Sequence, residues 1–190
     1  MKETEILHKV NLDSQIKPSD LPDIDLYMDQ VTQLFEKTYQ SSKRNEEDKI
    51  MTKTMINNYA KGKLLFPIKN KKYSKEHILL INLIYQLKGA LSIQDIRKTL
   101  DGINEGIVSE NLNLETVYNR YLNLHQSMMK DVKEQIKKIF QEVSMEAPNN
   151  EDSVLSQFFI IMSMAGMSNA YRKFAEQMVD QLDYQTESKD

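Results

Sequence analysis

Residues 49–75 read KIMTKTMINNYAKGKLLFPIKNKKYSK, and this stretch contains eight lysines and no acidic residue. The flanks are acidic, since residues 1–48 carry 6 Lys and Arg against 11 Asp and Glu, and residues 101–190 carry 8 against 15. Residues 49–100 carry 11 against 2, within a chain whose formal net charge is −3. Positive charge concentrated in this way is typical of a surface that binds a polyanion. The alternative interpretation is a solvated, lysine-rich face.

Apolar spacing and capping residues predict a mostly helical protein. Only five glycines and four prolines interrupt the 190 residues. Residues 1–25, with Pro18 and Pro22, are expected to form a loose N-terminal arm. Apolar residues recur at helical spacings in six segments, which are residues 26–39, 52–62, 75–88, 93–100, 114–143 and 153–182. Gly102 and Gly106 indicate a junction, so we expect a domain at residues 26–101 and a helical region at residues 102–190.

The helix predicted at residues 52–62 has Thr52 as its N-cap and Gly62 at its end. Its apolar side chains, among them Ile56 and Tyr59, should face the core. The side chains expected to point outward are Lys53, Thr54, Asn57, Asn58 and Lys61. Further along the chain, the polar residues 69–73 could close a small β-hairpin before Ser74 caps the next helix.

Residues 51–59 (MTKTMINNY) resemble the second helix of the winged helix-turn-helix found in MerR-type proteins. The similarity continues through Leu64-Leu65, Pro67 and Tyr73-Ser74 to residues 91–96 (LSIQDI), and it covers about residues 26–100. The sequence is also similar to an uncharacterised bacterial family that has a MerR-like N-terminal half and no assigned function. The resemblance implies a winged helix-turn-helix with a β-hairpin wing, followed by a region of long helices.

The resemblance also implies how DNA would be bound. Residues 52–61 would form the recognition helix in the major groove, and residues 69–73 a basic wing against the phosphates or in the minor groove. The DNA contacts that follow are Thr52, Lys53, Thr54, Asn57, Asn58, Lys61, Lys63, Lys69, Lys71, Lys72 and Tyr73. Asn can pair with adenine and Thr can meet a thymine methyl group. In MerR-type proteins, two arginines and a tyrosine usually occupy the positions of Thr54, Asn57 and Asn58.

Three departures from the MerR pattern concern these contacts. The loop at residues 40–48 is much longer than a tight helix-turn-helix turn. The glycine that precedes the double leucine is displaced, so Lys63 stands next to Leu64. The wing is short.

Two long helices are predicted in the rest of the chain. In MerR-type proteins such a helix pairs antiparallel in a dimer, which implies a homodimer through residues 114–143. The same apolar stripe could instead pack within one chain against residues 153–182, and the spacing leaves both arrangements open. The last helix is apolar nearly all round in its first half and should be largely buried. Seven of the eleven methionines lie beyond residue 127, which suits an ordinary core or a site for a small apolar effector.

Several other classes of protein are disfavoured by the sequence. There is no cysteine, and His8, His77 and His125 are isolated, so neither a metal nor another cofactor is expected. No phosphate-binding glycine loop or nucleophile motif is present, so we do not expect an enzyme. The N-terminus lacks a signal-peptide pattern, and a cytoplasmic location is expected.

The sequence therefore predicts a transcriptional regulator that binds double-stranded DNA. The alternative is a non-enzymatic helical interaction module whose lysine-rich block binds an acidic protein partner or RNA.

Overall fold

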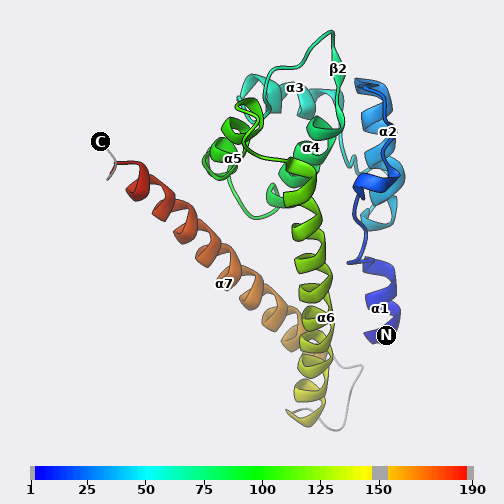
Figure 1. Cartoon of the computed structure of the whole chain (residues 1–190). Coiled ribbons are helices and arrows are strands. Elements are labelled where there is room, and N and C mark those ends of the chain that lie inside the picture. Colours follow the sequence, from blue (N-terminus) through cyan, green and yellow to red (C-terminus); the bar gives the residue numbers. More distant parts are fainter. Residues whose placement is uncertain (1–2, 147–153, 188–190) are drawn as a thin grey trace.

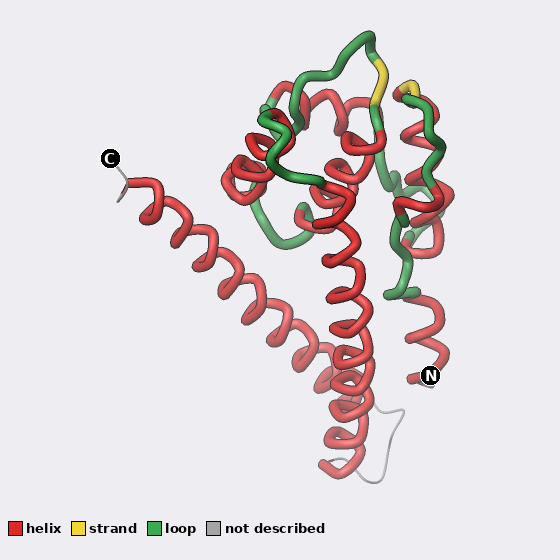
Figure 2. The backbone as a smooth tube through the Cα atoms, in the orientation of Figure 1, coloured by secondary structure: helices red, strands yellow, loops and turns green. Residues whose placement is uncertain are grey.

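A computed structural model describes residues 3–146 and 154–187, with side chains described as far as Leu182. These residues form a mostly helical protein with one small antiparallel sheet (Figures 1 and 2). The α-helices are α1 (Glu3–Val10), α2 (Met28–Tyr39), α3 (Lys53–Lys61), α4 (Lys75–Leu87), α5 (Ile93–Val108), α6 (Leu114–Glu146) and α7 (Val154–Glu187). The strands are β1 (Leu26–Tyr27) and β2 (Lys72–Tyr73), and two short 3-10 helices are η1 (Pro18–Asp20) and η2 (Gln40–Ser42).

Helix α4 lies at the centre of the fold, because its sequence from His77 to Leu87 contains no Asp, Glu, Lys or Arg. Ile78 to Ile81 and Ile84 are buried, and Ser74 caps the first turn as predicted. The rings of Phe35 and Tyr39 in α2 contact the Tyr85 ring in α4, with centroids 6.0 and 4.5 Å apart. A helix that is apolar on most sides is stable only when other elements surround it in this way.

The two strands pair antiparallel although they are far apart in the sequence. Leu26 lies opposite Tyr73, and Tyr27 lies opposite Lys72. The expected hairpin at residues 69–73 is reduced to a two-residue turn closed by one bridge between Lys69 and Lys72. The two residues of the turn, Asn70 and Lys71, have φ angles of 52° and 56°, which are the values of a type I′ turn.

The N-terminal segment is not the loose arm that the sequence predicted. Residues Glu3–Val10 form α1, and Ile16 and Leu21 are buried in the core. The hydroxyl of Tyr118, in α6, donates a 2.8 Å hydrogen bond to the carbonyl of Ile16. Pro18, one of the two prolines that indicated a loose lead-in, instead starts the short 3-10 helix η1, and the apolar residues Ile16 and Leu21 beside it are buried in the core.

The helix predicted at residues 93–100 is longer than expected, because α5 continues through Gly102 and Gly106 to Val108. The chain reverses after α5, where Glu110 adopts a φ of 59°. Gly106 is needed for packing, since a Cβ there would lie 2.8 Å from Cβ of Leu112. The expected junction at these glycines therefore lies inside a helix, and the turn comes after it.

Helix α6 confirms the long helix predicted from residue 114, whereas α7 contradicts the expectation of a buried helix. Figure 1 shows α7 running away from α6 at an angle. Its exposed large apolar side chains are Val154, Leu155, Phe158, Phe159, Ile161, Met162, Tyr171, Phe174, Met178 and Leu182. The helix contacts α6 and α5, but a helix that is apolar nearly all round needs more neighbours than these to be buried. Pro148-Asn149-Asn150, which the sequence predicts to interrupt the two long helices, lies outside the described residues.

One apolar core contains residues from Ile16 to Tyr118. The start of α6 therefore belongs to the same core as α2, α3 and α4, although the sequence suggested a boundary near residue 101. Among the described residues, no helix has both the length and the apolarity that crossing a bilayer requires.

Candidate nucleic-acid interface

Helix α3 has the two faces that the sequence predicted. The hydroxyl oxygen of Thr52 accepts a 3.1 Å hydrogen bond from the backbone N–H of Met55, so the residue caps the helix. Ile56 and Tyr59 are buried against the core. The side chains on the outward face are exposed, and they are Lys53, Thr54, Asn57, Asn58 and Lys61. This face presents amides, a hydroxyl group and ammonium groups from one rigid helix.

The end of α3 depends on an unusual pair of residues. Gly62 has a right-handed conformation, with φ −74°, while Lys63 takes the left-handed one, with φ 58°. Left-handed backbone is common for glycine and costs a residue with a Cβ about 1–3 kcal/mol. At position 62 a Cβ would lie 2.7 Å from Cδ1 of the buried Leu64, so any residue other than glycine would displace that side chain. The glycine displaced in the sequence is thus explained by packing, and Lys63 is left exposed at the helix end.

The turn at residues 69–72 projects beyond α3. Lys69 and Lys71 are exposed, while the ammonium group of Lys72 lies 5.2 Å from the ring centroid of Tyr27. Tyr73 differs from the prediction, because only 3% of it is exposed and its ring packs edge-on against His77. Its neighbour in the sheet, Tyr27, is 55% exposed. We therefore leave Tyr73 out of the proposed contacts and include Tyr27 as a surface residue beside the turn.

Sequence reasoning missed Tyr27 because β1 lies far from residues 69–73 in the chain. A signal was present nevertheless, because Tyr27 has high β propensity and stands directly before a helix. Pairing places alternate residues on opposite faces of a strand, so the burial of Leu26 puts the Tyr27 ring on the surface.

The lysines of this surface differ in whether they already form ion pairs with carboxylates of the same chain. Lys53 forms an ion pair with Asp29 of α2, and Lys75 forms one of 2.9 Å with Glu115 of α6. Within the described part of the chain, no ion pair involves the exposed Lys49, Lys61, Lys63, Lys69 or Lys71. The Lys53–Asp29 pair is itself well exposed, and such pairs contribute only about 0–1 kcal/mol. Most of the positive charge is therefore free to meet an anion.

The long loop before α3 is ordered by its own contacts. The carboxylate of Asp48 accepts hydrogen bonds from the backbone N–H groups of Arg44 and Asn45, at 3.1 and 3.0 Å, and these bonds lower the pKa of its carboxyl group. Ile50 is buried, and its carbonyl accepts a 3.1 Å hydrogen bond from Lys88. The loop thus holds the start of α3 in place, although it is longer than a tight turn.

His77 supports the base of the turn from the first turn of α4. Its Nδ1 accepts a 3.2 Å hydrogen bond from the backbone N–H of Ser74, which leaves Nε2 to donate to the carbonyl of Phe66, 3.3 Å away. This arrangement requires the neutral imidazole, because a protonated Nδ1 would face another N–H donor. Burial lowers the pKa of His77 and favours the same neutral form.

Figure 1 shows α3 and the segment leading to β2 at the same end of the molecule, while α6 extends toward the opposite end. A helix flanked by a basic turn can enter a groove of a duplex and contact the phosphates at its edge. The outward face of α3 and the turn thus form one candidate surface, which we call the basic end: Tyr27, Lys53, Thr54, Asn57, Asn58, Lys61, Lys63, Lys69, Lys71 and Lys72.

A comparison with known protein families gave a match to this chain. The family described as "Domain of unknown function (DUF1836)" matches residues 16–121. The chain belongs to this family. A search of the curated proteins and a search of the solved structures each gave no match.

The DUF1836 match has nearly the same limits as the core, which contains residues from Ile16 to Tyr118. The matched region therefore includes the basic end and the start of α6, while α7 lies beyond it. The family description carries no function, so the resemblance to MerR-type proteins remains a prediction from the motifs.

Proposed function

We propose that the protein binds double-stranded DNA through the basic end and regulates transcription. The observation that carries the proposal is the combination of an exposed polar face on α3 with unpaired lysines around it, at one end of the molecule. A surface rich in unpaired lysines binds a polyanion favourably, because binding releases counterions that were condensed on the polyanion. The neighbouring amides and hydroxyl group add the means to read bases.

In this arrangement α3 lies in the major groove. Asn57 and Asn58 present amides that can accept from N6 and donate to N7 of adenine, and the methyl group of Thr54 can contact a thymine methyl. Lys61 and Lys63, at the end of the helix, and Lys69 and Lys71, in the turn, contact phosphates on either side. Helix α3 contains no arginine, the residue that most often makes bidentate contacts to guanine, so A·T-rich targets are favoured over G·C-rich ones.

We further propose that the protein acts as a homodimer through residues 114–143 of α6 and the exposed apolar side chains of α7. Within α6, Leu124 and Met128 are exposed and available for the interface, because the start of the helix already belongs to the core. Ten large apolar side chains of α7 are exposed. At roughly half exposure each they present on the order of 1,000 Å² of apolar surface, which is comparable to the 800 Å² per partner of a stable interface. A two-fold dimer would present two copies of α3, and it would select an inverted repeat.

The DNA-binding proposal is tested with the triple variant Lys61→Gln, Lys69→Gln and Lys71→Gln. These residues are exposed and form no ion pair in the described part of the chain, so the fold should be unaffected. Binding to a duplex is measured by fluorescence anisotropy over a salt series. Each lost phosphate contact should reduce the slope of log Kd against log salt by about 1, giving a total of about 3.

The matched control is Lys17→Gln, Lys130→Gln and Lys173→Gln, which removes the same charge from exposed positions away from α3. Its salt slope should stay within about one unit of the wild type. Equal slopes for the two triple variants would contradict the proposal. If the wild type binds single-stranded RNA or an acidic peptide as tightly as any duplex, the helical interaction module becomes the better interpretation.

A further inference from the structure

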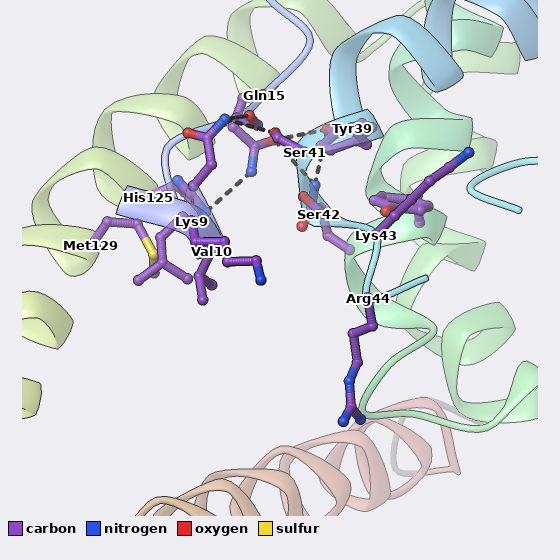
Figure 3. A pocket seen from close by; sticks show the side chains of 15 residues that line it. Lys9, Val10, Gln15, Tyr39, Ser41, Ser42, Lys43, Arg44, His125 and Met129 are labelled. Carbon is purple, nitrogen blue, oxygen red and sulfur yellow. Dashed lines mark hydrogen bonds between the residues drawn. The ribbon is translucent and has the colours of Figure 1, made fainter. Parts of the chain in front are cut away.

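A second site lies away from the basic end, between α1, the end of α2, α4 and α6. It is a cavity of about 770 Å³, shown in Figure 3. Small-molecule sites in proteins usually have volumes of about 300–1,000 Å³. The cavity is therefore large enough for a metabolite with one or two rings or a short chain of functional groups.

The charged residues that line this cavity are all basic. They are Lys9 of α1, and Lys43 and Arg44 just after η2, and no Asp or Glu lines it. This is unexpected in the part of the chain that supplies most of the lining, because residues 1–48 carry 11 acidic residues against 6 basic ones. Lys43 is neutralised by an ion pair with Glu36. Lys9 and Arg44 form no ion pair among the residues described. Arg44 does interact electrostatically with Asp48, whose pKa it helps to lower, so the cavity retains the charge of Lys9 and part of the charge of Arg44.

The floor of the cavity is a fixed set of polar groups. Nε2 of Gln15 lies 3.1 Å from Nε2 of His125, and Nε2 of Gln86 donates to the Tyr39 hydroxyl over 3.1 Å. Figure 3 shows Gln15, Tyr39 and His125 near one another, while Arg44 extends away from them toward the lower edge of the view. Met129 and the Tyr85 ring add apolar surface. Such a lining suits a ligand with an anionic group at one end and an uncharged, partly apolar body.

The cavity is connected directly to the segment that leads into α3. Nδ2 of Asn11 donates to the Ser41 hydroxyl over 2.9 Å, across the boundary between α1 and η2. Residues 41–44 then continue into the loop that ends at Thr52, the cap of α3. A ligand that contacts both Lys9 and Arg44 would favour the arrangement in which these segments approach, and any difference in affinity between arrangements shifts their populations.

We propose that this cavity binds a small organic anion, with its phosphate or carboxylate group held by Lys9 and Arg44, and that the ligand changes the affinity of α3 for DNA. The effect on DNA affinity rests on the proposed function, whereas the binding of the anion does not. The site differs from the apolar effector site that the methionines suggested, because Met129 is the only methionine in its lining.

The experiment measures ligand binding to the full chain in the absence of DNA. The thermal midpoint is recorded with AMP, citrate and benzoate, and with adenosine as the uncharged counterpart of AMP, each at about 10 mM. At least one anion should raise the midpoint, and adenosine should not. A response to AMP alone indicates a phosphate ligand, and a response to citrate or benzoate alone indicates a carboxylate ligand.

The double variant Lys9→Gln and Arg44→Gln should bind the active anion at least about tenfold more weakly, while the control Lys17→Gln and Lys130→Gln should bind it as the wild type does. The proposal is overturned if none of these anions raises the midpoint, or if both double variants respond equally.

The Lys61, Lys69 and Lys71 triple variant separates the two proposals, because it should lose DNA affinity and keep anion binding. Anion binding without any change in the Kd for DNA would overturn the coupling alone.

Discussion

The hydroxyl of Tyr39 donates a 2.6 Å hydrogen bond to Oδ1 of Asn82, and both side chains are buried. This bond joins α2 to α4, and Nδ2 of Asn82 donates in turn to Oε1 of Gln15 over 3.3 Å. Burial raises the pKa of Tyr39 above its ordinary value, so the donor keeps its proton. An amide in the middle of an apolar helix thus links three segments that the sequence places far apart.

We expect Asn82→Ala to lower the free energy of unfolding by about 2–4 kcal/mol, because it removes the 2.6 Å acceptor of the buried Tyr39 hydroxyl and the amide group that donates to Gln15. Tyr39→Phe should cost about 1–2 kcal/mol. Urea unfolding followed by circular dichroism measures both. Asn123→Ala, at an exposed amide of α6, is the control and should stay within about 0.5 kcal/mol. If Asn82→Ala is as stable as this control, the network does not stabilise the fold.

The end of α3 predicts opposite effects for two neighbouring substitutions. Lys63→Gly should raise the free energy of unfolding by about 1 kcal/mol, since it relieves the left-handed backbone. Gly62→Ala should lower it by about 1–3 kcal/mol, because the added Cβ forces Leu64 to move. Thermal unfolding measures both. Lys63→Ala removes the same charge and keeps the Cβ, so it should give none of the gain; equal gains from alanine and glycine would refute the strain argument.

His77 predicts a loss of stability at mildly acidic pH. Its pKa in the folded protein lies below the unfolded value near 6.5, so the unfolded chain binds the proton more readily. The contribution of His77 to the free energy of unfolding is complete above about pH 6.5 and decreases as the pH falls toward the pKa in the folded protein. Each unit between the two pKa values corresponds to about 1.4 kcal/mol. Chemical unfolding at about pH 7.5 and 5.5 measures the difference.

The control for this pH dependence is a pair of variants. His77→Gln should reduce the difference between the two pH values. His125→Gln should leave unchanged the portion of the pH-dependent stability difference that His77 causes. Burial lowers the pKa of His125 as well, so this variant can lose the portion that His125 causes. A His77→Gln protein with the full wild-type pH dependence would show that the contacts with Ser74 and Phe66 do not hold this imidazole neutral.

The exposed face of α7 predicts that assembly depends on its apolar side chains. Ile161→Glu together with Phe174→Glu should raise the dissociation constant of the dimer by about a hundredfold or more, because each buries a charge in an apolar contact. Sedimentation equilibrium measures this constant. Ser163→Glu adds a charge at an exposed polar position of the same helix and serves as the control. A wild-type protein that stays monomeric at about 100 μM rules the dimer out.

Local signals predicted the elements that depend on local chemistry. Thr52 and Ser74 cap α3 and α4 as their residue types suggested, and the alternation of apolar and polar residues placed the outward face of α3 correctly. These features depend on residues within one or two turns of a helix. They are therefore readable from a single sequence.

The features that depend on distant partners were not predictable in the same way. Ile16 is buried because Tyr118 lies beside it, and Tyr73 is buried because it pairs with Leu26. The extent of α5 depended on whether Gly106 faces solvent or Leu112. For α7, an apolar sequence indicates that the helix needs partners. The sequence does not show whether those packing partners come from the same chain or from a second one.

Two of the eight lysines in the basic block, Lys63 and Lys71, occupy left-handed backbone that glycine or asparagine would adopt with less strain. Both are exposed, and both belong to the proposed contact surface. A library of variants selected for heat resistance alone should replace these lysines, whereas selection for occupancy of an operator should retain them. The two selections would diverge at the same two codons. Those positions would then be the ones at which the chain retains backbone strain in order to keep a positive charge.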